Sequence, residues 1–170
     1  MKFPSLKEFF HPAEEHPSCQ VESLLRDKHI AFEQHHHEPA YTAQEVAATE
    51  HVPGRYMAKV VIAFADERMV MLLLPAPEKV NLLKLADEMC TEDVRLASEE
   101  EFAEVFSDCE IGAMPPFGNV YGLPVYIDKT LARDDHIVFQ AGTHTDTIEM
   151  AYGDYVRLVH PRVADFVYAS

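Results

Sequence analysis

Residues 57–74 read MAKVVIAFA-DER-MVMLLL, two apolar runs separated by three charged residues. Both runs, Met57–Ala65 and Met69–Leu74, are rich in β-branched and other apolar residues, which is typical of β-strands. The short polar interruption between them predicts a β-hairpin. This hairpin is the feature of the sequence that most limits the choice of fold.

Helical and strand signals alternate on the amino-terminal side of the hairpin. We expect a helix over 19–28 with Ser18 as its N-cap and a strand over 30–36. Thr42 and Glu45 have the spacing of a capping box, which predicts a helix ending near His51. Pro53 and Gly54 then separate this helix from the hairpin.

The carboxyl-terminal side shows the same mixture. Asn81 is a predicted N-cap for a helix to about Met89, and Ser98 with Glu101 predicts a capped helix to about Phe106. Strands are expected over 94–97, 125–128, 136–140 and 145–150, and a helix over 152–159. A hairpin mixed with helices indicates an α+β fold rather than a doubly wound parallel sheet.

Length and composition predict one domain. The 170 residues, 48% of them hydrophobic, suffice for one sizeable core. We expect an extension over 1–17, a domain over 18–160 and a tail over 161–170. No apolar run reaches the roughly 18 residues of a membrane span, and no signal-peptide pattern is visible, so a cytoplasmic protein is expected.

Two features of composition narrow the possible function. The three cysteines, Cys19, Cys90 and Cys109, are odd in number and widely spaced, which favours reduced thiols over a disulfide framework. The formal net charge of -15 argues against nonspecific binding of nucleic acid. A local basic patch would still suffice to bind the end of a nucleic acid, and it could be formed by Arg55, Lys59, Lys79 and Lys84.

Lys59 is unusual because it lies within an otherwise apolar strand. Alternation places it on the same face as Met57, Val61 and Ala63. It is either an edge lysine that prevents aggregation or a cation at a cleft that binds phosphate or polarises a carbonyl.

The segment 112–118, GAMPPFG, combines rigid prolines with permissive glycines around an aromatic residue that we expect to be exposed. It is either a connector or a binding loop whose amides donate to an oxyanion.

Histidines give weaker signals. His144 lies in a polar turn that could bring an imidazole to a pocket rim, although most loop histidines are solvated. His35 and His37 share a face by alternation, but no third ligand has recognisable spacing, so a metal site is not favoured. The motifs of serine hydrolases, zinc proteases and P-loop nucleotidases are missing from the sequence.

Taken in order, these features resemble the YbaK and prolyl-tRNA synthetase editing-domain family over roughly 18–159. The resemblance rests on His37 followed by YTAQEVA at 41–47, on Lys59, and on the segments 74–81, 94–102 and 111–118. Asp128 and Ala141-Gly142 complete the order.

The resemblance implies a mixed, barrel-like β-sheet wrapped by helices, and hydrolysis of the ester between an amino acid and the terminal ribose of tRNA. It assigns Lys59 and, from a weaker local match, His144 to catalysis. It assigns the following to substrate binding: Tyr41, Thr42, Gly112, Ala113, Met114, Pro115, Pro116, Phe117, Gly118, Asp128 and Gly142.

The mechanism that we expect uses Lys59 to anchor the terminal phosphate or the aminoacyl carbonyl, and loop amides to stabilise the oxyanion. A ribose hydroxyl or the substrate side chain would activate water, because the sequence shows no obvious base.

The partner is the aminoacylated 3′ end of tRNA, with an aminoacyl-tRNA synthetase as a further candidate, and neither DNA, membrane, metal nor cofactor is expected. A noncatalytic module that recognises a nucleotide, small metabolite or synthetase is the alternative, and a metal-binding protein is a more remote one.

Overall fold

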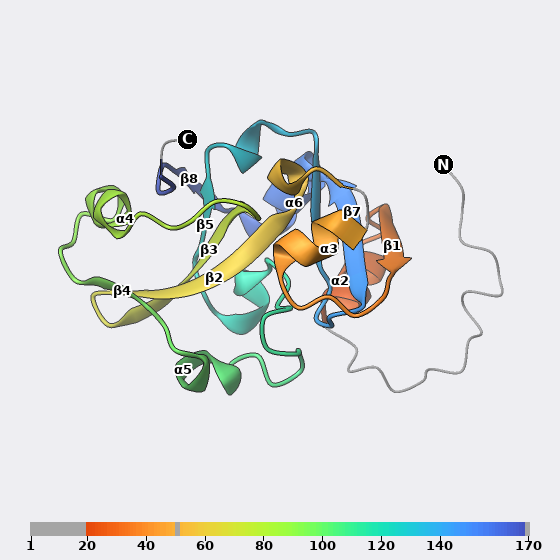
Figure 1. The fold of residues 1–170 in the computed structure, drawn as a ribbon, viewed down its shortest axis with the longest axis horizontal. Helices are drawn as coiled ribbons and strands as arrows, with labels where there is room; N and C mark the ends of the chain where they lie inside the picture. Colours follow the sequence, from red (N-terminus) through yellow and green to blue (C-terminus); the bar gives the residue numbers. More distant parts are fainter. Residues whose placement is uncertain (1–19, 50–51, 169–170) are drawn as a thin grey trace.

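The computed structural model describes residues 20–49 and 52–168. Within them the chain folds as two β-sheets with helices packed around them, an α+β architecture as expected (Figure 1). The proposed N-cap Ser18 and the predicted extension 1–17 lie outside the described residues. No helix in the described ranges is long and apolar enough to cross a membrane.

The predicted hairpin is the centre of the larger sheet. Strands β2 (Ala58–Ala65) and β3 (Arg68–Pro75) pair antiparallel from Ala65↔Arg68 to Ala58↔Pro75. Asp66 and Glu67 form the turn with φ of 49° and 65°, the left-handed values that the tight hairpin turn requires. Arg68, which we had placed in the turn, therefore begins the strand.

The larger sheet has the order β4-β2-β3-β5-β8 and the smaller one β1-β7-β6. The remaining strands of the larger sheet are β4 (Val94–Leu96), β5 (Val125–Asp128) and β8 (Arg162–Ala164); those of the smaller sheet are β1 (Phe32–His36), β6 (His136–Gln140) and β7 (Asp146–Ala151). A parallel bridge between Met57 and Val138 joins the sheets where β2 meets β6.

The α-helices match most of the sequence signals. They are α2 (Gln20–Asp27), α3 (Ala43–Thr49), α4 (Leu82–Glu88), α5 (Glu99–Ala103) and α6 (Tyr152–Val159). Asn81 caps α4, and Ser98 with Glu101 forms the predicted capping box of α5. That helix ends at Ala103, before the predicted Phe106, and continues as turns.

At α3 the reciprocal hydrogen bond differs by one residue from the expected one. The Thr42 hydroxyl accepts from the Glu45 amide at 3.1 Å, but the Glu45 carboxylate accepts from the amide of Tyr41 rather than that of Thr42.

Three hydrophobic clusters explain the layers. The largest lies between the sheets, where Ile62 and Leu73 of the larger sheet face Phe139 and Ile148 of the smaller one. The second lies between the other face of the larger sheet and α4. In the third, α3 covers Met57 and Val138 on the outer face of the smaller sheet.

The segment expected as a carboxyl-terminal tail is part of this packing. Its strand β8 pairs parallel with β5, and Phe166 is fully buried in the second cluster. This strand was not predicted, because three residues are too few for a clear strand pattern.

Candidate active site

The β6–β7 loop presents His144 on a braced turn. The hydroxyls of Thr143 and Thr145 both donate to Oδ2 of Asp146, and His36 Nδ1 lies 3.0 Å from its Oδ1. Burial raises the pKa of Asp146, but these hydrogen bonds, led by that from Thr143, outweigh it and hold the pKa below its ordinary value. An ionised Asp146 therefore fixes the loop around His144.

A second loop is joined to this one. The Gly142 amide donates to the Ala113 carbonyl at 2.8 Å, and the Gly142 carbonyl accepts from the Glu110 amide at 2.8 Å. Oε2 of Glu110 also accepts from the backbone amide of His144 at 2.7 Å. Gly142 has a φ of 95°, a left-handed conformation that glycine adopts without strain.

The segment that follows β1 also contacts the loop that carries His144. The His37 amide donates to the Thr145 carbonyl at 2.7 Å, and the Ala40 amide donates to the His144 carbonyl at 3.0 Å. The Tyr41 ring consequently lies against the His144 ring, with 4.9 Å between centroids. A Cβ at Gly112 would lie 3.6 Å from Cε1 of His144 and 3.9 Å from the Tyr41 carbonyl oxygen. Four predicted residues, Tyr41, Gly112, Gly142 and His144, are thus brought together.

Lys59 lies on the face of β2 that we expected. Met57 belongs to the cluster under α3, and Ala63 and Val61 belong to the cluster behind the larger sheet. The Met57–Val138 bridge aligns β2 with β6, and alternation turns Lys59 and Gln140 to the same side as that bridged pair.

Burial lowers the pKa of the half-buried Lys59 ammonium. Glu78 opposes this change by attraction, and Lys79 adds to it by repulsion. A partly desolvated cation attracts an anion more strongly than a hydrated one does.

The outer face of the smaller sheet holds two polar residues, Gln140 and Thr147, that were not predicted from the sequence. Among the described residues, four buried side-chain atoms have no hydrogen-bond partner: His37 Nε2, Gln140 Nε2, His144 Nδ1 and Thr147 Oγ1. Gln140 and Thr147 are cross-strand partners, so their side chains share a face. Leaving such a group without a partner costs about 1–3 kcal/mol, so a concentration of them indicates a place where a ligand supplies the missing bonds. The available signal was two polar residues at alternating positions within otherwise apolar strands.

The proline loop is more buried than expected. Phe117, predicted as exposed, is fully buried with its ring against Phe139 and Tyr155, and this prediction was wrong. The Tyr155 hydroxyl donates to the Pro116 carbonyl at 2.7 Å. The prolines therefore anchor the loop in the core, and only Gly112 at its start is exposed.

Most of the loop amides are already engaged. The Ala113 amide donates to Glu110, that of Phe117 to the Pro115 carbonyl, and that of Gly112 faces the Met114 sulfur at 3.3 Å. Within the described residues the Met114 amide has no hydrogen-bond partner. Of the described loop amides without such a partner, it is the nearest to Gly112 in the sequence.

The structure gives two other predicted residues structural contacts. Asp128 is fully buried, and its carboxylate accepts from the amides of Thr130 and Phe166, each at 3.0 Å, and from the Thr130 hydroxyl at 2.6 Å. Thr42 caps α3. Neither side chain is joined to the His144 cluster by the contacts of the described residues.

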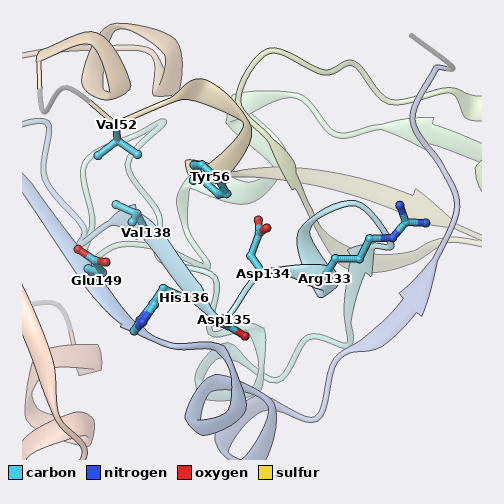
Figure 2. Close-up of a pocket in the computed structure, with 8 residues that line it drawn as sticks. All are labelled: Val52, Tyr56, Arg133, Asp134, Asp135, His136, Val138 and Glu149. Carbon is cyan, nitrogen blue, oxygen red and sulfur yellow. The ribbon is translucent and has the colours of Figure 1, made fainter.

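A cavity of about 410 Å³ lies beside Val138 of β6, at the edge of the smaller sheet. Figure 2 shows Asp134 pointing toward Tyr56, with Glu149, His136 and Val138 on the adjoining strands. Burial raises the pKa of Asp134. The lining of the cavity includes three carboxylates and none of the residues predicted for the site. It consists of Val52, Tyr56, Arg133, Asp134, Asp135, His136, Val138 and Glu149. The cavity therefore does not suit a phosphate-bearing ligand.

The histidines of the run 35–37 lie in different environments, His35 at the surface and His37 buried. The ligand atoms of His35, Glu33 and Glu149 lie within 4.8 Å of one another at the surface, and His35 Nε2 is 3.6 Å from Glu33. Glu33 is exposed, and ion pairing is a sufficient account of the three groups. His37 is instead buried, with Nδ1 2.6 Å from the Glu38 carbonyl oxygen.

The predicted basic patch is partly neutralised. Lys84 pairs with Asp165 at 3.2 Å, and Arg55 stacks over Tyr56 with 4.6 Å to the ring centroid. Lys59 and Lys79 are close enough to repel one another. They remain the two lysines of the patch that are positioned to act together.

The sequence is similar to those of known proteins. The model of the aminoacyl-tRNA editing domain matches residues 37–158, a range that includes Lys59, Gly112 and His144. A proline–tRNA ligase of Thiobacillus denitrificans is 39% identical over 77 residues, 45% of this chain and 13% of the ligase. The multifunctional Ser/Thr-tRNA deacylase ProXp-y of Escherichia coli is 32% identical over 98 residues, 57% of this chain and 58% of the deacylase. The chain thus matches less than two thirds of the length of these relatives.

Solved structures share the fold. A proposed trans-editing enzyme for prolyl-tRNA synthetase superposes with a TM-score of 0.75 at 22% identity, covering 90% of this chain and 98% of the other. The family model covers most of the chain, including both loops that hold His144. The chain belongs to the aminoacyl-tRNA editing domain family.

Proposed function

We propose that this protein is a trans-acting aminoacyl-tRNA deacylase that hydrolyses the ester of a tRNA mischarged with a small amino acid. The observation that carries the proposal is the joining of three segments at His144, Gly112 and Tyr41, beside buried polar atoms without partners. Family membership supports ester hydrolysis on tRNA, and one relative is named as a Ser/Thr-tRNA deacylase. The cytoplasm, as the site of translation, is the proposed compartment.

The chemistry assigned to Lys59 is electrostatic. Its ammonium anchors the terminal phosphate or the ester carbonyl, and partial burial strengthens that attraction. The Met114 amide, which has no hydrogen-bond partner among the described residues, would donate to the oxyanion that forms when water attacks the carbonyl. Preorganised donors of this kind reduce the barrier because they need no reorientation during the reaction.

Gln140 and Thr147 are proposed as contacts for the amino-acid part of the substrate. The Gln140 amide group can donate a hydrogen bond, and the Thr147 hydroxyl can donate or accept one. A site built to bond a substrate hydroxyl discriminates against an analogue without it. Seryl and threonyl esters are therefore expected to react faster than alanyl esters.

A binding module without turnover is the second candidate, and the net charge of -15 is the observation that favours it. Such a module would recognise a nucleotide, small metabolite or synthetase, and would bind without releasing an amino acid. Its prediction differs from that of an enzyme in one measurable quantity, turnover.

The experiment is deacylation of purified tRNAs charged with alanine, cysteine, serine, threonine or proline, without any synthetase. The intact protein is compared with Lys59→Ala and with Lys28→Ala, a change at an exposed lysine after α2. We expect turnover of one or two esters, lost with Lys59→Ala and kept with Lys28→Ala. Binding without turnover by the intact protein would establish the module instead.

A further inference from the structure

His37 is one of the four described side chains that have a buried atom without a hydrogen-bond partner. It directly follows β1, is only 9% exposed, and has its amide bonded to Thr145 of the His144 loop. Neither composition nor spacing gave it a chemical role, apart from membership of the histidine run. Its burial in contact with the His144 loop separates it from the solvent-accessible His35 and His36.

The hydrogen bond at Nδ1 determines what Nε2 can do. Nδ1 lies 2.6 Å from the Glu38 carbonyl oxygen, and a carbonyl oxygen only accepts. Nδ1 is therefore assigned the proton, and in the neutral ring Nε2 carries the lone pair. That lone pair is buried and has no partner among the described residues. A backbone carbonyl that fixes one ring nitrogen is a common way to orient an imidazole for chemistry at the other.

The face of the sheet on which the His37 side chain lies follows from strand alternation. His37 continues the face of Glu33 and His35, which lies opposite the face that β1 turns to the core. Thr147, the cross-strand partner of His35, and Gln140, the partner of Thr147, share that outer face. The His37 side chain thus lies on the side of the sheet that carries Gln140, Thr147 and Lys59.

Charged and titratable groups adjoin this region from each element packed around it. Glu38 follows His37 itself, His144 and Asp146 belong to the β6–β7 loop, Glu110 belongs to the loop joined to it, and Lys59 belongs to β2. Asp146 is bonded to Thr143, Thr145 and His36, and Glu110 to the His144 amide. These two carboxylates therefore hold the loops, whereas His37 Nε2 is a buried ring nitrogen without a hydrogen-bond partner among the described residues.

We propose that His37 is a catalytic residue whose Nε2 accepts the proton of the attacking water. This inference rests on the deacylase function proposed above. The water oxygen bonds to the ester carbonyl carbon while its proton moves to Nε2. The resulting oxyanion then collapses and breaks the bond to the ribose oxygen, which receives the proton from Nε2. One ester and one water yield one amino acid and one free tRNA hydroxyl, and His37 is regenerated.

The test measures single-turnover deacylation of the ester that the intact protein hydrolyses fastest. His37→Ala and His37→Gln are compared with His35→Ala, which removes an imidazole two residues earlier, on the same face. Loss of a general base lowers rates by roughly 10²–10⁴-fold, so both His37 variants should lose activity to that extent. His35→Ala should stay within about threefold of the intact protein.

Chemical rescue separates a proton acceptor from a structural residue. Added imidazole should restore part of the rate of His37→Ala and change neither His35→Ala nor the intact protein. The melting temperature of each variant shows whether it is folded, and His37→Gln supplies a second variant if the alanine disrupts packing.

The assignment is overturned if folded His37 variants retain the full rate, or if imidazole rescues His144→Ala and not His37→Ala. A loss of activity in folded His37→Ala that added imidazole does not restore would also overturn it. An intact protein without turnover on any ester overturns the proposed function and this role together.

Discussion

Glu110 holds His144 at two points. Its Oε2 accepts from the His144 amide at 2.7 Å and lies 3.9 Å from Nε2 of the same residue. The first contact fixes the backbone of the β6–β7 loop, and the second places a carboxylate beside the imidazole. The position of His144 is thus set by a loop more than thirty residues earlier in the chain.

Glu110→Ala should therefore reduce deacylation more than Glu110→Gln. The glutamine oxygen can still accept from the His144 amide, whereas alanine removes both contacts. We expect a decrease of about tenfold or more in kcat for alanine and a smaller one for glutamine, measured under steady-state conditions. Equal rates for the two variants would show that the loop does not need this support. Glu104→Ala, at an exposed position after α5, is the control.

The alkaline limit of activity should depend on Lys59. Burial lowers its pKa from the ordinary 10.5, so the cation is lost as pH rises through that lowered value. If the cation is required, activity falls on the alkaline side at a lower pH than for an exposed lysine.

The two charges near Lys59 predict shifts of opposite sign. Glu78→Gln removes the attraction that raises the pKa, so the alkaline limit should move to lower pH. Lys79→Gln removes a repulsion and should move the limit to higher pH. The measurement is kcat/KM against pH, corrected for spontaneous ester hydrolysis at each pH. Shifts in the same direction for both variants would contradict a cationic role for Lys59.

The sequence predicted the local elements well, because apolar runs and capping residues act over short distances. The hairpin at 57–74 and the cap at Asn81 are examples in which neighbouring residues determine the structure. The tail after His160 failed as a prediction because β8 is formed by its partner β5 and by burial of Phe166, which are tertiary effects.

Only some residues of the candidate site stand out in the sequence, for the same reason. Gly112 and Lys59 are unusual residues in their local context, so a pattern alone draws attention to them. Gln140, Thr147 and the orientation of His37 become visible only when separate strands share a face. Phe117 was wrongly predicted to be exposed. An aromatic residue between prolines and glycines can be exposed on a loop, but it can equally anchor the loop in the core, as Phe117 does against Tyr155.

Alanine substitutions of the two glycines at the ends of the proline loop should have different effects, one on stability and the other on activity. At Gly118 a Cβ would lie 2.6 Å from Cγ2 of Val125 and 2.8 Å from the Leu123 carbonyl oxygen. Overpacking of this kind typically costs about 1–3 kcal/mol, so Gly118→Ala should lower the free energy of unfolding. The folded fraction should retain its specific activity.

At Gly112 a Cβ meets no atom closer than 3.6 Å, but φ is 87° and the nearest atom belongs to His144. The left-handed conformation costs about 1–2 kcal/mol for alanine, and relief of that strain would displace the loop from His144. Gly112→Ala should therefore lower kcat/KM in protein that is still folded. Denaturant unfolding and deacylation assays on both variants check the contrast, and a stable but inactive Gly118→Ala would contradict it.

Asp128 provides a direct test of a site residue taken from resemblance. Its carboxylate is fully buried and accepts three hydrogen bonds, from the Thr130 amide and hydroxyl and from the Phe166 amide. In Asp128→Asn the side-chain amide would face a donor, because only one of its two terminal atoms can accept. Such a mismatch costs about 1–3 kcal/mol, so we expect reduced stability toward urea with kcat/KM of the folded protein unchanged. Asp135→Asn, at an exposed position, should change neither quantity. If Asp128→Asn instead kept full stability and lost turnover, Asp128 would belong to the substrate site as the resemblance implied, and the contacts with Thr130 and Phe166 would be secondary to that role.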